Sequence, residues 1–159
     1  MRTIRILLVS TMTILGLAVG AVAPGIAAAQ SEGKTKCKAV SGFAAGQGVV
    51  GPDGTIRTTA TVTKDPVLKG RLEGQFAVTG DPSPDIPFAG HITFTTKKGT
   101  LVTQVTGSLT ATGAFETVGQ VSAGTGKFAG AKGKLVIVGN QDQTGAFTET
   151  IKGKICLRK

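Results

Sequence analysis

The chain has 159 residues, a formal charge of +9, 24 glycines, one histidine, two cysteines and neither tryptophan nor tyrosine. Glycine and β-branched residues are poor helix formers, so this composition argues against a helical bundle. The length suits one domain rather than two. One histidine and two cysteines exclude most metal sites that need several such ligands, and we expect neither a metal nor a cofactor.

The first residues predict a secretory signal peptide. Met1–Arg5 carries two arginines, residues 6–23 are apolar and uncharged, and a Pro-Gly pair precedes three alanines that end at Ala29. A basic start, an apolar middle and a small-residue end are the parts of such a peptide. We expect cleavage near Ala29, which leaves residues 30–159 as one secreted or periplasmic domain without stable membrane insertion. The alternative is an uncleaved anchor, because the apolar run is just long enough to span a bilayer.

Two cysteines stand near the ends of the predicted mature domain, Cys37 and Cys156. Export makes a disulfide permissible, and two cysteines allow one intramolecular pairing. The pairing requires the first and last strands to lie close together, as they do when a sheet closes on itself. The alternative is two unpaired thiols.

The rest of the chain is predicted to be all-β, because apolar residues recur at every second position and no segment shows a helical stripe. Eight sequential strands with short turns suit an up-and-down barrel or a sandwich. In chain order, the predicted strands cover residues 37–48, 54–64, 70–79, 87–96, 100–110, 113–122, 133–140 and 146–156.

Glycines inside the predicted strands favour the barrel. Glycine weakens a strand, so its repeated use on the apolar phase indicates bends or close backbone approach. A small barrel needs both, because its sheet must coil sharply. We therefore predict an eight-stranded antiparallel up-and-down β-barrel of the calycin-like kind. The glycines concerned are Gly74, Gly90, Gly107, Gly119, Gly139 and Gly153.

A glycine-rich segment, Gly124-Thr-Gly-Lys-Phe-Ala-Gly-Ala-Lys-Gly133, lies between the sixth and seventh predicted strands. Phosphate-binding glycine motifs open a helix, whereas a β-rich run follows here, so nucleotide binding is not expected. The segment resembles the glycine-rich "GTGKF-x-x-A-x-G" stretch of the allene oxide cyclase and dirigent barrel superfamily. In that superfamily it joins two late strands of an eight-stranded antiparallel barrel. We expect Phe128 to plug one end of the core.

The resemblance implies an apolar barrel interior and the possibility of a homotrimer. Plant members cyclise an unstable fatty-acid epoxide or steer the coupling of phenolic radicals, and secreted bacterial relatives are mostly of unassigned function. The tyrosines of the dirigent pocket have no counterpart here, because this chain has no tyrosine. No catalytic residue is carried across from the family.

The apolar strand phases give the candidate site. We expect a small apolar molecule to bind among Phe76, Phe94, Val105, Phe115 and Ile151. On the last strand, Glu149 shares the apolar phase with Phe147 and Ile151. An inward carboxyl is desolvated, which raises its pKa and prepares it as an acid or base. The alternative is a wet or lysine-paired glutamate at the barrel rim.

Three functions stay open. The first is a binding module for a small apolar molecule. The second is a cofactor-free isomerase or cyclase that uses Glu149 as its acid or base. The third is a non-catalytic structural or envelope-interacting protein, in which the basic surface meets anionic polymers or lipid head groups. Nucleic acid is not expected as a partner, because export argues against it and no aromatic reading surface accompanies the charge.

Overall fold

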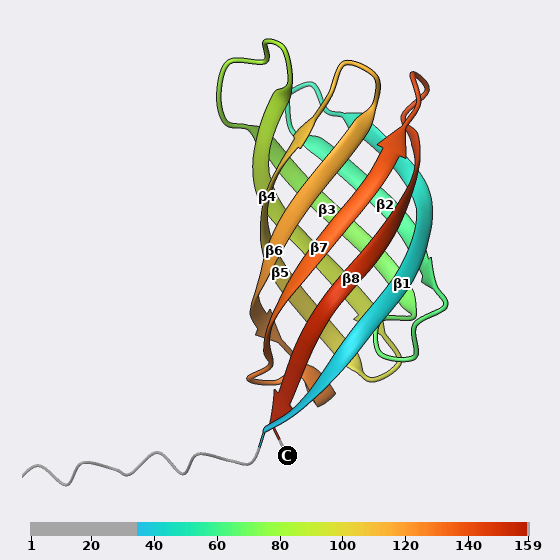
Figure 1. The fold of residues 1–159 in the computed structure, drawn as a ribbon, viewed down its shortest axis with the longest axis vertical. Helices are drawn as coiled ribbons and strands as arrows, with labels where there is room; N and C mark the ends of the chain where they lie inside the picture. The colour runs from blue at the N-terminus through green and yellow to red at the C-terminus, as the bar shows by residue number, and fades with distance from the viewer. Residues whose placement is uncertain (1–34, 159) are drawn as a thin grey trace, which may run out of the picture. The chain divides into compact units, whose positions relative to one another are not determined.

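The computed structural model describes residues 35–158; the predicted signal peptide and its cleavage site lie outside these described residues. Eight antiparallel strands form a closed barrel in which each strand pairs with its neighbours in the sequence and β8 pairs with β1 (Figure 1). The predicted fold is therefore confirmed. The elements are β1 (Thr35–Val50), β2 (Ile56–Thr63), β3 (Gly70–Val78), β4 (Ile86–Thr96), β5 (Gly99–Leu109), β6 (Ala114–Gly124), the 3-10 helix η1 (Gly126–Phe128), β7 (Lys132–Gln141) and β8 (Ala146–Arg158).

Up-and-down topology sends alternate turns to opposite ends of the barrel. We call one end the mouth end; it carries the turns 51–55, 79–85, 110–113 and 142–145. The other is the closed end; it carries the turns 64–69 and 97–98, the segment 125–131, the start of β1 and the end of β8. In Figure 1 the mouth end is at the top and the C-terminus marks the closed end. The proline-rich segment 80–87 contributes to the mouth end.

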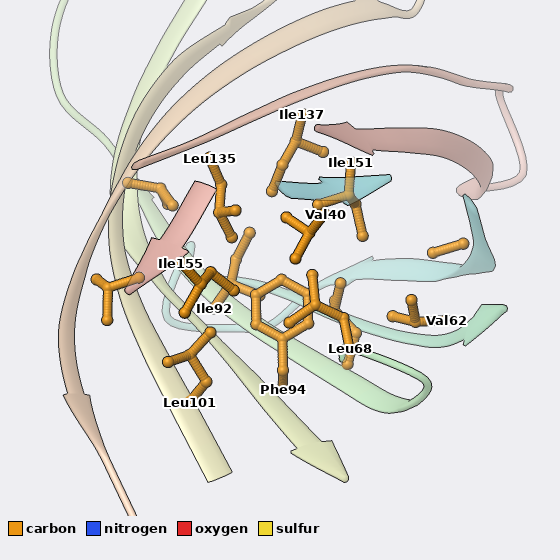
Figure 2. Close-up of a cluster of buried hydrophobic side chains, with 14 of the residues drawn as sticks. Val40, Val62, Leu68, Ile92, Phe94, Leu101, Leu135, Ile137, Ile151 and Ile155 are labelled. Atoms are coloured by element: carbon orange, nitrogen blue, oxygen red, sulfur yellow. The ribbon is translucent and has the colours of Figure 1, made fainter. Parts of the chain in front are cut away.

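Side chains of the apolar phases fill the half of the barrel next to the closed end. Phe94, Leu101, Leu135, Ile151 and Ile155 are completely buried there, and Figure 2 shows them converging from strands on different sides of the barrel. Protein interiors of this kind are close-packed, so truncating such a side chain leaves a cavity.

The closed end is sealed by the glycine-rich segment and by the turn 64–69. Gly126, at φ +55°, adopts a left-handed conformation that glycine tolerates, and Phe128 behind it is 1% exposed. Phe128 therefore plugs the core as predicted. From the other turn, Leu68 is fully buried. The carboxylate of Asp65 holds that turn by accepting hydrogen bonds from the backbone N–H groups of Ser41, Val67 and Leu68, each at 2.8 Å.

The predicted disulfide is present. Cys37 and Cys156 are direct partners in the register of β1 and β8, and their sulfur atoms are bonded. The link joins the first and last strands where the barrel closes, at a sequence separation of 119 residues. Such a bond persists in oxidising compartments and is consistent with an extracellular location. Across residues 35–158, no helix is long and apolar enough to cross a membrane.

Candidate functional site

The half of the barrel next to the mouth is not completely filled. A cavity of about 60 Å³ lies there, and aromatic and aliphatic side chains make up most of its wall. The lining residues are Ile56, Thr58, Leu72, Phe76, Phe88, Ile92, Leu109, Phe115, Thr117, Ile137, Gln141, Phe147 and Glu149.

Each of the four phenylalanines in this wall lies opposite a glycine of a neighbouring strand. The cross-strand pairs are Phe76 with Gly90, Phe88 with Gly107, Phe115 with Gly139, and Phe147 with Gly46. A glycine leaves room for the ring on the next strand, and the ring covers the exposed backbone in return. The rings interlock in two edge-to-face pairs, Phe76–Phe88 at 5.4 Å and Phe115–Phe147 at 6.2 Å between centroids. This pairing fixes the shape of the cavity wall.

Glu149 is the acidic group of the cavity. It stands on β8 between Ala44 of β1 and Gly139 of β7, and only 6% of its surface is exposed. A Cβ atom at Gly139 would lie 2.9 Å from the Cβ of Glu149, so the absence of a side chain at Gly139 makes space for the glutamate. Of the two alternatives that the sequence leaves open, the structure therefore shows the inward carboxyl rather than a wet glutamate at the rim.

The surroundings of Glu149 leave its charge uncompensated. Its Oε1 atom has no hydrogen-bond partner within the described part of the chain, and none of the described residues that line the cavity is lysine, arginine or histidine. Desolvation raises the pKa of this carboxyl from 4.5 to about 7. A carboxylic acid in this state donates a hydrogen bond below neutral pH and accepts a proton just above it.

The cavity adjoins a wider hollow at the mouth end. This hollow has a volume of about 990 Å³ and shares Ile56, Phe88, Leu109 and Gln141 with the cavity. Its rim is partly apolar, since Val50 is 72% exposed.

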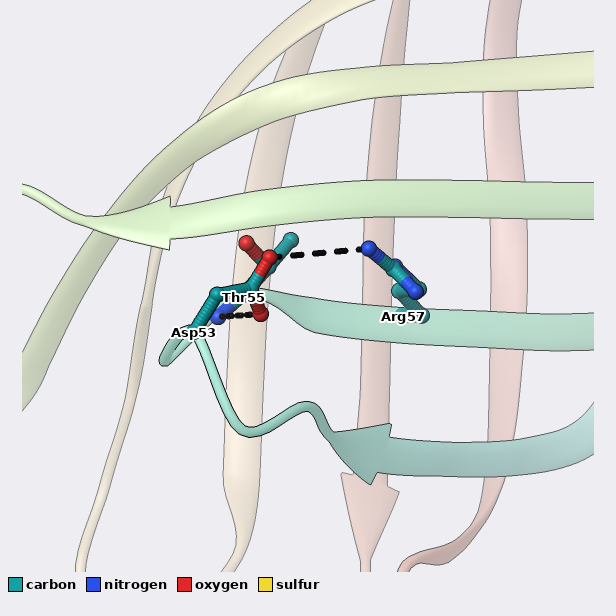
Figure 3. A network of polar contacts seen from close by, with 3 residues as sticks. All are labelled: Asp53, Thr55 and Arg57. Atoms are coloured by element: carbon teal, nitrogen blue, oxygen red, sulfur yellow. Dashed lines mark hydrogen bonds and ion pairs between the residues drawn. The ribbon is translucent and has the colours of Figure 1, made fainter.

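The turns at the rim are held by their own polar groups. Asp53 accepts a hydrogen bond from the backbone N–H of Thr55 at 3.0 Å and lies 3.6 Å from the guanidinium of Arg57 (Figure 3). Asp142 does the same for its turn by accepting bonds from the N–H groups of Thr144 and Ala146. These hydrogen bonds lower the pKa of both carboxyls. The rim therefore keeps its negative charge.

The structure divides the predicted ligand-binding residues between two layers. Phe76 and Phe115 line the cavity. Phe94, Val105 and Ile151 point inward as expected but lie outside the cavity wall, in the buried core. The physical reason is their height along the barrel: strands tilt and stagger around a closed sheet, so residues of one phase belong to different layers.

Several wall residues were not singled out as site residues from the sequence, among them Phe88, Thr117, Ile137 and Phe147. All four occupy the inward phase of their strands. The feature that distinguishes the phenylalanines of the cavity wall from those of the core is a glycine directly opposite each ring on the neighbouring strand. This pairing can be recognised only when the strand register is known. Within residues 35–158, no group of three or more His, Cys, Asp or Glu side chains is placed to hold a metal ion.

Comparisons with known proteins bear on the fold. No family model matches the chain, and no curated protein matches it. Among solved structures, the chain is similar to one described as "Structure of the pterocarpan synthase dirigent protein PsPTS1", with a TM-score of 0.54 and 15% sequence identity over 79% of this chain and 97% of that one. The chain thus has a dirigent-like barrel fold. At this identity the likeness shows the fold alone.

Proposed function

We propose that the barrel binds a small, largely apolar molecule that enters through the mouth end and directs one polar group toward Glu149. The single observation that carries the proposal is a buried carboxyl, one oxygen of which has no hydrogen-bond partner among residues 35–158, in a mostly apolar cavity next to the mouth hollow. Ligand sites typically combine apolar walls with a few placed polar groups.

The two volumes suggest how such a ligand lies. The cavity of about 60 Å³ is far smaller than the roughly 300–1,000 Å³ of ordinary small-molecule pockets. It accommodates only a small group, whereas the mouth hollow of about 990 Å³ has room for the remainder. We therefore expect an elongated ligand with its apolar body in the hollow and one end in the cavity.

A matched pair of variants on β6 tests this proposal. Thr117 is buried in the cavity wall, and the next residue, Val118, lies on the outer face of the barrel. Thr117→Phe fills the cavity, whereas Val118→Phe adds the same ring outside. With an environment-sensitive apolar dye as the probe, we expect binding to the wild type and to Val118→Phe and at least tenfold weaker binding to Thr117→Phe. Equal binding by both variants, or none by the wild type, would overturn the proposal.

A second candidate function is isomerisation or cyclisation of the bound molecule, with Glu149 as the acid and base. It is favoured by the pKa of about 7 for this carboxyl, because proton transfer is most effective when the catalytic pKa lies near the working pH. In such a step the acid gives its proton to one atom of the ligand and takes a proton back from another. The ligand's composition is unchanged, so no cofactor is consumed.

Glu149→Gln separates the two candidates. The amide keeps the size and polarity of the side chain but cannot exchange a proton in this way. Retained binding of a converted ligand with loss of its turnover supports the catalytic role. Unchanged turnover removes that role and leaves the binding proposal standing.

A further inference from the structure

The two ends of the barrel carry opposite charge. The turns and strand ends of the closed end are rich in lysine and arginine, and all of these side chains are exposed. They come from every turn at that end and from both terminal strands, so they surround the closed end, and Lys134, Lys152 and Lys154 continue the basic surface along the outer wall of β7 and β8. The basic residues of the closed end are Lys36, Lys38, Lys64, Lys69, Lys97, Lys98, Lys127, Lys132 and Arg158.

Little negative charge offsets this group. Asp65 is the acidic residue of the closed-end turns; it is 5% exposed, and its carboxylate is occupied by three backbone N–H groups. Within residues 35–158, the ion pairs are Arg57–Asp53 at the mouth and Arg71–Glu73 at the start of β3 beside the closed end, and none of the nine basic residues named above takes part in either. The exposed aspartates of the turns gather at the mouth end: Asp53, Asp81, Asp85 and Asp142.

A small recess marks the centre of the basic group. Lys38, Lys98 and Lys127 line this recess of about 60 Å³ together with apolar atoms of Val67, Phe128 and Leu157. The three lysines come from β1, from the turn between β4 and β5, and from η1. Lysine ammonium groups around an apolar floor suit a single anionic group such as a phosphate, whose oxygens accept their hydrogen bonds.

We propose that the closed end docks the barrel onto an anionic lipid surface, with the mouth end directed away from it. Charge that surrounds one end of the barrel can meet a planar array of head groups from every side at once, whereas a linear polymer would contact only part of it. In addition, the chain enters the barrel at this end, because β1 begins here at Thr35.

The docking is peripheral and electrostatic. Over residues 35–158, the exposed large apolar side chains belong to the mouth end or the outer wall. The closed end therefore offers charge without an apolar side chain to insert. Attraction of this kind contributes about 1 kcal/mol for each lysine or arginine near the surface and is screened within a Debye length. The exposed apolar residues are Val49, Val50, Val78, Val118 and Val138.

Vesicle binding by the full chain tests the proposal. The probe is phosphatidylcholine vesicles with and without 30 mol% phosphatidylglycerol, a fraction chosen on the order of natural anionic membranes. One triple variant replaces Lys38, Lys98 and Lys127 by glutamine. The matched control replaces Arg57, Lys134 and Lys152 by glutamine; these residues are exposed on the outer wall of β2, β7 and β8, so that both variants lose the same charge.

We expect binding only to the anionic vesicles at low salt. The closed-end variant should bind roughly a hundredfold more weakly, whereas the wall variant should lose less than tenfold, because fewer of its basic residues approach the surface. An equal loss in both variants would mean that net charge alone governs binding, and it would overturn the proposal. Binding to soluble polyphosphate with the same variant dependence, but not to vesicles, would overturn it in favour of a free polymer. Thermal unfolding of each variant confirms that it is folded.

Orientation has its own reporter, because the chain contains no tryptophan. A tryptophan introduced by Pro66→Trp stands at the closed end, and one introduced by Val50→Trp stands at the mouth. Both positions are exposed. We expect anionic vesicles to shift the emission of the first tryptophan and to leave the second unchanged. The reverse pattern would show that the mouth end docks, which contradicts the proposal.

Discussion

The two halves of the barrel are built from the same eight strands with the same alternation, yet they differ in what fills them. Toward the closed end, buried side chains such as Phe94, Leu101 and Phe128 pack against one another. Toward the mouth, each phenylalanine is matched with a glycine, and a cavity remains. The alternation of side chains along each strand therefore decides which of them point into the barrel. The size of the inward residues at each level along the barrel axis decides whether they fill the interior or leave a cavity.

The same contrast holds for the buried carboxyls. Asp65 at the closed end accepts three backbone hydrogen bonds, whereas one oxygen of Glu149 in the mouth half has no partner in the described residues. A satisfied carboxylate stabilises its surroundings, and an unsatisfied one costs stability. We infer that the closed half holds the fold together and that the mouth half is the part available for binding.

Among the changes considered, removing the disulfide at the closed end should cause the largest loss in the free energy of unfolding. Cys37→Ser with Cys156→Ser frees a loop of nearly the whole domain, which in chain-entropy terms lowers the free energy of unfolding by about 4–5 kcal/mol. Urea denaturation followed by circular dichroism measures the loss. Reductant should destabilise the wild type similarly and leave the double variant unaffected. A double variant as stable as the oxidised wild type would contradict this role.

Truncating one phenylalanine in each half compares the two regions directly. Phe94 is fully buried in the closed half, so Phe94→Ala should lower the free energy of unfolding by about 4 kcal/mol. Phe76 is only partly buried and already adjoins a cavity, so Phe76→Ala should lower it by roughly half as much. The measurement is again urea denaturation. Equal losses would show that the mouth half is packed as tightly as the closed half.

The pH dependence of stability should report on Glu149. Its pKa is about 7 in the folded protein against 4.5 as the reference, so the folded state holds a proton that the unfolded state releases between these values. Stability is therefore full below about pH 4.5 and falls as pH rises through 7, by about 3 kcal/mol in all.

Glu149→Gln removes this dependence, because the amide does not titrate. We expect the variant to be more stable than the wild type by about 2–3 kcal/mol at pH 8 and to match it near pH 4. Thermal or urea unfolding across this pH range provides the measurement. A wild type whose stability does not decline between pH 5 and 8 would contradict a raised pKa.

The smallest effect should come from the turn carboxylates. Asp65→Ala leaves the N–H groups of Ser41, Val67 and Leu68 without their acceptor and should lower the free energy of unfolding by about 2 kcal/mol. Asp142 also accepts several hydrogen bonds in its own turn, but it is fully exposed at the mouth. Water can replace its bonds, so Asp142→Ala should change stability little. A larger loss of stability for Asp142→Ala than for Asp65→Ala would contradict the conclusion that the closed end contributes more to the stability of the fold than the mouth end.

Much of this architecture was accessible from alternation, glycine placement and cysteine count. They predicted the closing disulfide and eight strands that differ from the observed ones only at their ends, and they placed Glu149 on the apolar phase of the last strand. The resemblance of residues 124–133 pointed to a dirigent-like barrel, and the structural similarity confirms that fold. These features follow from local patterns, because a period of two fixes the face of a residue whatever its distant neighbours are.

The division of the inward residues into layers needed the tertiary structure. Phe94, Val105 and Ile151 share a phase with Phe76 and Phe115, and only the register of the closed sheet separates the core from the cavity wall. The charge separation has the same origin: the sequence contains the lysines and aspartates, but the up-and-down topology sends alternate turns to opposite ends. The sequence by itself thus determined the positions of the strands, the face of the sheet on which each side chain lies, and the disulfide that joins the first and last strands. Height along the barrel depends on how strands far apart in the chain are staggered, and only the folded sheet decided it.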